Sequence, residues 1–176
     1  MPVIADPFLL PDMLKRGQRL LGLDLGTKTI GLAISDPGFS VASPIGTIRR
    51  TKFTQDAMEL ARLVKDREVG ALVLGLPINM DGSEGPRAAS TRQFAANLIE
   101  RADLFGADPQ IGFWDERLST SAVTRMMIEA DMTRKRRGEV VDKMAAAYIL
   151  QGFLDALANR RRLARLAEEE NEGGEP

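Results

Sequence analysis

The chain has 176 residues, 44% of them hydrophobic, which is enough for one compact α/β domain and too little for two large ones. Its 24 basic and 25 acidic residues give a formal net charge of −1, which argues against a strongly basic nucleic-acid binder. Cysteine and histidine are both absent, so disulfides, thiolate zinc sites, cysteine nucleophiles and histidine general bases are excluded.

The two ends of the chain differ in composition from the part between them. Residues 1–17 contain three prolines and no sustained periodicity, so we expect an N-terminal extension there. Residues 161–176 are expected to form a charged, acidic tail, which leaves the domain at residues 18–160. No apolar run could span a membrane and no cleavable leader pattern is present, so a cytoplasmic protein without membrane contacts is expected.

The pattern of the chain predicts an antiparallel meander followed by alternating helices and strands. From residue 20, a strand, a Gly-Thr-Lys turn, a second strand, a Pro-Gly turn and a third strand follow one another. The polar stretch 78–87 is predicted to be a loop long enough for a function. The remaining predicted elements are a helix over 53–69, a strand over 70–77, a helix over 88–105, a strand over 110–116, a helix over 120–130 and a helix over 140–166. We therefore predict a mixed five-stranded sheet, three strands antiparallel and two parallel, with helices on both faces.

An acid interrupts the first predicted strand. Side chains alternate along a strand, so Asp24 shares one face with Gly22 and Gly26 while leucines occupy the other. The glycines leave open space beside the carboxylate, which suits a large group arriving from outside. A buried charge needs a partner that offsets its desolvation, and a hydrogen-bonded aspartate at a strand end is the plainer alternative.

Two further sites carry acids at informative positions. Asp115 and Glu116 end the last strand, where α/β proteins place their chemistry, and at most one of these neighbours can point toward Asp24. Asp142 lies in the first turn of the last helix, on a face of small side chains. A solvated acidic pair and an acid favoured by the helix dipole are the plainer alternatives. Together, acids from these elements can converge on one or two hard cations such as Mg²⁺ or Mn²⁺.

Four motifs resemble one known family in order and spacing: LGLDLGTKTIGLAISD, VLGLPINMDGSEGPR, DERLST and VVDKMAAAYILQ. The chain resembles the YqgF/RuvX proteins, bacterial relatives of Holliday junction resolvases, over residues 19–157. The resemblance implies an RNase H-like fold with catalytic, metal-binding acids at Asp24, Glu116 and Asp142, and with Asp115 as a less certain neighbour. It further implies a cytoplasmic nuclease that matures the 5′ end of 16S ribosomal RNA with Mg²⁺ or Mn²⁺. Holliday junction resolution is the older interpretation of the family.

Cations near the predicted site indicate how a polyanion would be held. Four consecutive cations lie one turn before Asp142, where backbone phosphates would pass: Arg134, Lys135, Arg136 and Arg137. Lys28, Arg87 and Arg117 could extend this basic rim. The loop over 79–86 could contact phosphate through backbone amides or could simply be mobile. Recognition of backbone and shape suits structured precursor rRNA or branched DNA, and the sequence leaves a monomer and a homodimer both open.

Two other functions compete with the nuclease. The Asp-x-Gly-Thr pattern also resembles the phosphate loop of actin-like and sugar-kinase ATPases, but those proteins close two such domains around a nucleotide and this chain supplies one. The second is a non-catalytic RNase H-like module that binds RNA or a protein partner. The retention of all three acids weighs against it.

Overall fold

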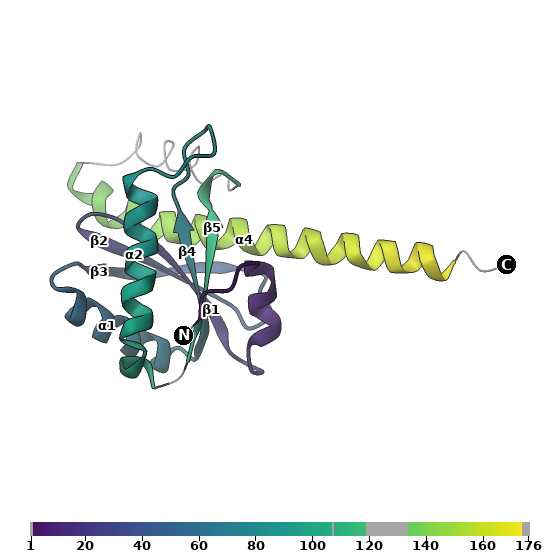
Figure 1. Cartoon of the computed structure of the whole chain (residues 1–176), viewed down its shortest axis with the longest axis horizontal. Helices are drawn as coiled ribbons and strands as arrows, with labels where there is room; N and C mark the ends of the chain where they lie inside the picture. The colour runs from purple at the N-terminus through teal and green to yellow at the C-terminus, as the bar shows by residue number, and fades with distance from the viewer. Residues whose placement is uncertain (1, 107, 119–133, 174–176) are drawn as a thin grey trace.

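A five-stranded sheet organises the computed structural model, which describes residues 2–106, 108–118 and 134–173, with the side chains of 134–143 outside the description (Figure 1). The strand order is β3-β2-β1-β4-β5. The strands are β1 (Arg19–Leu25), β2 (Thr29–Ser35), β3 (Ala42–Arg49), β4 (Val69–Leu76) and β5 (Gln110–Asp115). The first three strands pair antiparallel, whereas β4 runs parallel to β1 and β5 runs parallel to β4. This confirms the predicted mixed sheet.

Helices cover both faces of the sheet. Leu21 and Leu23 of β1 lie in a core shared with α1 (Phe53–Asp66) and α2 (Pro86–Glu100), whereas Leu20 lies in a second core shared with α4 (Arg134–Glu172). The alternation of side chains along β1 therefore separates the two cores. The helix predicted over 88–105 ends at Glu100, and the 3₁₀ helix η2 (Ala102–Phe105) follows it. The helix predicted over 120–130 lies outside the described residues.

The N-terminal segment is packed into the domain. The backbone N–H of Ile4 donates to the carbonyl oxygen of Ile111 at 2.7 Å, so this segment covers the open edge of β5. The 3₁₀ helix η1 (Pro7–Met13) follows, and its Leu10 is fully buried in the second core. Aromatic rings complete the contact: Phe8, Trp114 and Phe153. Residues that the sequence assigns to an extension thus close one core of the domain.

Helix α4 begins earlier and ends later than the predicted helix over 140–166. The basic run Arg134–Arg137, which was predicted to precede the helix, forms its first turn. Straight-chain cations are good helix formers, and a single glycine at position 138 is too weak a breaker to separate them from the helix. At the other end, the helix continues through Glu172 as an arm that projects from the sheet (Figure 1). Within the described ranges, no helix is long and apolar enough to cross a membrane.

Candidate metal centre

The buried carboxylate of Asp24 lies in the middle of the sheet. Its residue is 7% exposed, and β1 pairs with β2 on one side and β4 on the other. Gly31 is its partner in β2, and Gly75 of β4 lies level with it, one residue beyond the Leu23–Leu74 pair. Glycines therefore flank Asp24 across both neighbouring strands as well as along its own strand. The position of the carboxylate between the backbones of Gly31 and Gly75 is called the well.

The side chain of Glu116 reaches the same well from β5. Glu116 begins η3 (Glu116–Leu118), directly after the strand. A Cβ atom added to Gly75 would lie 2.7 Å from Glu116 Oε1 and 3.3 Å from its Cγ, so the glutamate occupies space that a side chain at Gly75 would take. The same Cβ would lie 2.7 Å from Ile149 of α4, which places Glu116 and Asp24 on the α4 face of the sheet. Two of the three predicted acids are brought together around Gly75.

The direction of helix α4 across the sheet brings its first turns toward these acids. A Cβ on Gly22 of β1 would lie 2.8 Å from Leu150, so the helix packs closely against β1. Gln151 accepts a hydrogen bond from the backbone N–H of Ala42 at 2.8 Å, and Ala42 pairs with Ser35, which lies beside the start of β1. Later turns of α4 are therefore near the start of β1, and earlier turns run toward its end, where Asp24 lies.

The backbone of Asp142 belongs to this part of α4, one turn before Ala146. Its side chain is outside the described residues. Among the side chains that the structure does describe, no group of three acids forms a metal site. Asp24 and Glu116 are thus the two predicted ligands whose side chains the structure describes, and the metal-binding role of all three acids stays a prediction.

The carboxylate of Asp115 accepts hydrogen bonds from Arg117. The Nη2 and Nε atoms of Arg117 donate to Asp115 at 2.7 and 3.1 Å, and its backbone N–H donates at 2.9 Å. These hydrogen bonds lower the pKa of Asp115 and raise that of Arg117, so both stay charged. Trp114 pairs with Gly75 and lies in the core under α4, so the next residue of β5, Asp115, takes the opposite face of the sheet. Glu116 begins η3 and reaches Gly75 on the α4 face. The adjacent acids therefore have different surroundings, and only Glu116 lies in the well.

The loop after β4 is an ordered hairpin. Ile78 and Glu84 form a bridge, and the backbone N–H of Asn79 donates to the carbonyl of Ser83 at 2.9 Å. Arg117 also donates to the carbonyl of Asn79 at 3.1 Å, which joins the loop to the end of β5. On its other side, Glu84 accepts a hydrogen bond from Arg92 Nε at 2.7 Å. These contacts hold the loop at the rim of the well.

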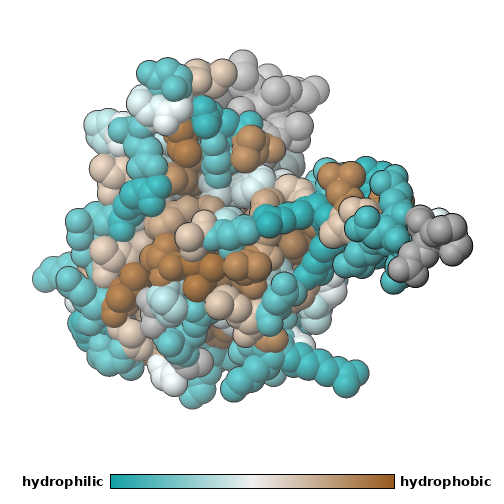
Figure 2. Space-filling view, turned by 45° about the vertical axis from the view of Figure 1, so that its right-hand side comes forward, coloured by the Kyte–Doolittle hydropathy of each residue, from teal (hydrophilic) through white to brown (hydrophobic). Residues whose placement is uncertain are grey.

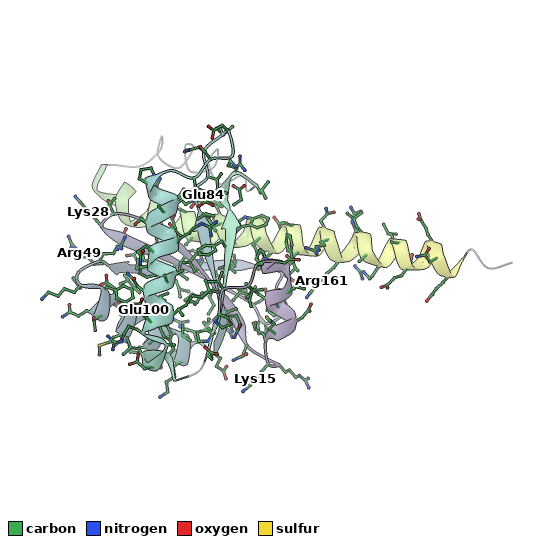
Figure 3. The ribbon with its side chains drawn as sticks, viewed as in Figure 1. Lys15, Lys28, Arg49, Glu84, Glu100 and Arg161 are labelled. Atoms are coloured by element: carbon green, nitrogen blue, oxygen red, sulfur yellow. The ribbon has the colours of Figure 1, made fainter. Side chains whose placement is uncertain are left out.

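Cations gather at the end of the sheet that carries Asp24. Lys28 lies in the β1–β2 turn, and Arg49 at the end of β3 pairs with the adjoining Thr29. Both are exposed and point outward on the same side (Figure 3). Arg50 supports the turn from inside, because its Nη1 donates to the carbonyl of Gly26 at 2.7 Å. Sequence reasoning missed Arg49 and Arg50, although the meander itself predicts that the end of the third strand returns to the first turn.

The other residues that were predicted to contact nucleic acid do not all lie together. Arg87 is exposed at the start of α2. Arg117 takes part in the internal network with Asp115 and Asn79. The side chains of residues 134–137 lie outside the description.

A family model described as RuvX, Holliday junction resolvase, matches residues 18–156. A protein of Rhodospirillum centenum, named "Putative pre-16S rRNA nuclease", is 74% identical over 144 residues, which cover 82% of this chain and 77% of that protein. A protein of the same name from Paramagnetospirillum magneticum is 63% identical over 155 residues, which cover 88% of this chain and 96% of that protein.

Among solved structures, the chain is similar to T. thermophilus RuvC in complex with a Holliday junction substrate. The TM-score is 0.52 at 12% sequence identity, and the match covers 82% of this chain and 96% of that one. At this identity the likeness concerns the fold alone, and it confirms the RNase H-like arrangement of the sheet and helices.

Proposed function

Because the chain belongs to the RuvX family, we propose that it is a metal-dependent nuclease that hydrolyses phosphodiester bonds of precursor 16S rRNA at its 5′ end, in the cytoplasm. The observation that carries this proposal is the position of the Glu116 side chain beside Gly75, the residue of β4 that lies level with Asp24. The shared name of the relatives supports the RNA substrate. The family description supports branched DNA as the alternative substrate.

The donor set fits a hard divalent cation. Asp24, Glu116 and Asp142 offer only carboxylate oxygens, which Mg²⁺ and Mn²⁺ prefer, and the glycine at position 75 leaves space that the Glu116 side chain occupies. These three residues would hold the cation, which when bound supplies Lewis-acid stabilisation of the phosphoryl oxygens. A bound cation would also offset the repulsion between carboxylates that share one site. The centre is therefore arranged for a positive charge.

The chain's own cations would bind and orient the polyanion. Lys28 and Arg49 stand on one side of the well, and Arg87 stands at the start of α2. Asp115 acts as a positioning residue, because it orients Arg117 at the rim. The run over 134–137 opens the helix that carries Asp142, so we keep it as a predicted phosphate contact.

Replacing Gly75 with alanine is expected to displace Glu116 and to lower kcat by about tenfold or more. The added Cβ would lie 2.7 Å from Glu116 Oε1, closer than van der Waals contact allows, and a small misplacement of a catalytic group can cost about 10²-fold. Steady-state cleavage kinetics with Mn²⁺ measure the effect. Gly85→Ala is the matched control, since its added Cβ would lie 3.5 Å from the nearest atom. Equal activity of both variants would remove Glu116 from the centre.

The substrate is tested by cleavage of two nucleic acids under the same conditions. Precursor 16S RNA with an extended 5′ end and a synthetic four-way DNA junction are each incubated with Mg²⁺, with Mn²⁺ and with a chelator. We expect cleavage of the RNA at the mature end with either metal and none with the chelator. Symmetric cutting of the junction with intact RNA would instead assign the chain to junction resolution. Failure to cut either substrate would favour the non-catalytic module.

A further inference from the structure

The C-terminal arm of α4, residues 158–172, extends beyond the sheet, and all of its residues are exposed. Figure 1 shows this arm continuing the long axis of the molecule away from the strands. Near its start, Arg160 pairs with Asp6 at 3.0 Å and Arg161 pairs with Asp12 at 3.3 Å. Helices in proteins draw most of their stability from packing an apolar face. A projecting arm therefore raises the question of what packs against it.

One face of the arm is apolar at its centre. Leu163 and Leu166 are 54% and 47% exposed. Leu166 follows the buried Leu157 by about two and a half helical turns, so it lies on the side of α4 opposite the sheet. In Figure 2 an apolar patch on the arm is surrounded by hydrophilic side chains. This face is separate from the metal centre.

Charges of opposite sign lie at the two ends of this face. Arg162 precedes the leucines and Glu169 and Glu170 follow them, at the spacing of a single helical face. Acids near the C-terminus of a helix also oppose its dipole, which favours cations there. The dipole of the arm's own helix therefore does not stabilise these acids. A second helix that runs in the opposite direction would place arginine beside these glutamates.

We propose that the arm binds the same arm of a second copy of this chain, antiparallel and centred on Leu166. Arg162 and Glu170 are each four residues from Leu166, so a twofold axis through Leu166 brings each arginine beside the glutamate of the other copy. Leu166 then lies on the axis between these two ion pairs, and Leu163 faces the aliphatic part of Glu169 in the other copy. Nucleic acid and anionic membranes fit the face poorly because its acidic end would repel them. The pairing does not depend on nuclease activity.

Charge reversal tests the pairing in the full chain. Arg162→Glu and Glu170→Arg should each weaken self-association by about tenfold or more, because like charges then face one another. The double variant exchanges the two charges and should restore association to that of the unchanged protein. Sedimentation velocity from the low- to the high-micromolar range measures the dimer. Arg62→Glu, an exposed reversal on α1, is the control that should change nothing.

Three results would overturn the proposal. They are a monomer at every concentration, a double variant as weak as the single ones, and association that grows stronger with added salt.

Cysteine cross-linking tests how the two arms are aligned in the dimer. Native cysteines cannot interfere, because the chain has none. Leu166→Cys lies on the proposed axis, and oxidation should join it to its counterpart, since disulfides need Cα atoms about 4.4–6.8 Å apart. Residue 164 is also exposed, but it lies on the opposite side of the arm. The variant Ala164→Cys should therefore stay reduced. Equal cross-linking of both variants would contradict the assigned face.

Discussion

Asp24→Asn is expected to abolish metal-dependent cleavage and to leave the protein folded. The amide has the shape of the carboxylate but no charge, so the centre loses an anionic oxygen ligand. Loss of an outer-shell partner already costs about 10–100-fold in metal affinity or activity, and loss of a direct ligand should exceed about a hundredfold. Without metal the protein should stay folded, because asparagine keeps the shape of the side chain and an oxygen that can accept hydrogen bonds. Cleavage assays and chemical denaturation measure the two effects.

The matched control for this variant is the second buried aspartate. Asp56 is 4% exposed, but it accepts hydrogen bonds from the backbone and hydroxyl of Thr51, at 3.0 and 3.2 Å, at the start of α1. Asp56→Asn should therefore lower stability by about 1 kcal/mol and leave activity unchanged. The two variants separate catalysis from folding. Cleavage by purified Asp24→Asn protein at the normal rate would contradict the assignment of Asp24 as a metal ligand.

Phe153→Ala is expected to cause the largest loss of stability, about 3–5 kcal/mol. Its ring is fully buried beneath α4, 5.5 Å from the ring of Phe8 and 5.6 Å from that of Trp114. Removing it leaves a cavity between the sheet, the helix and the N-terminal segment. At about 2–4 °C per kcal/mol for a chain of this size, Tm should fall by roughly 6–20 °C. Thermal and urea denaturation measure the change.

Two comparisons show whether this loss comes from the second core. Phe153→Leu retains most of the apolar volume and should cost less, while Leu163→Ala on the exposed arm should be nearly neutral in dilute solution. Because Phe8 stacks on Phe153, limited proteolysis should also cut the N-terminal segment faster in Phe153→Ala. Resistance equal to that of the unchanged protein would show that the segment is held without this contact.

Local patterns predicted most of the elements and both faces of the first strand. Alternation with period two placed Leu21 and Leu23 in one core and Asp24 on the other face, since this pattern depends only on the backbone of one strand. The boundaries were less accurate. Helix α2 ends at Glu100 and α4 extends to Glu172, because helix ends depend on packing and on neighbouring elements as well as on composition.

The N-terminal segment could not be placed from its own sequence. Its prolines and short apolar residues carry no periodicity, and its position depends on the free edge of β5 and on the aromatic rings that meet there. The predicted acidic tail likewise becomes the end of a long helix. The position of the N-terminal segment involves residues distant in the chain, which a local pattern does not contain, whereas the exposed end of α4 continues the helix before it.

By itself, the sequence excluded histidine and cysteine from the chemistry, and it predicted that an acid interrupts an apolar strand and that the sheet is mixed. The tertiary structure decided which acid of the Asp115–Glu116 pair lies in the well, because the face of each follows from the pairing of β5 with β4. It also decided that Gly75, fifty-one residues after Asp24, shapes the same site. The register of parallel strands is set by the crossover between them and by the packing of both cores, so it is a property of the whole fold.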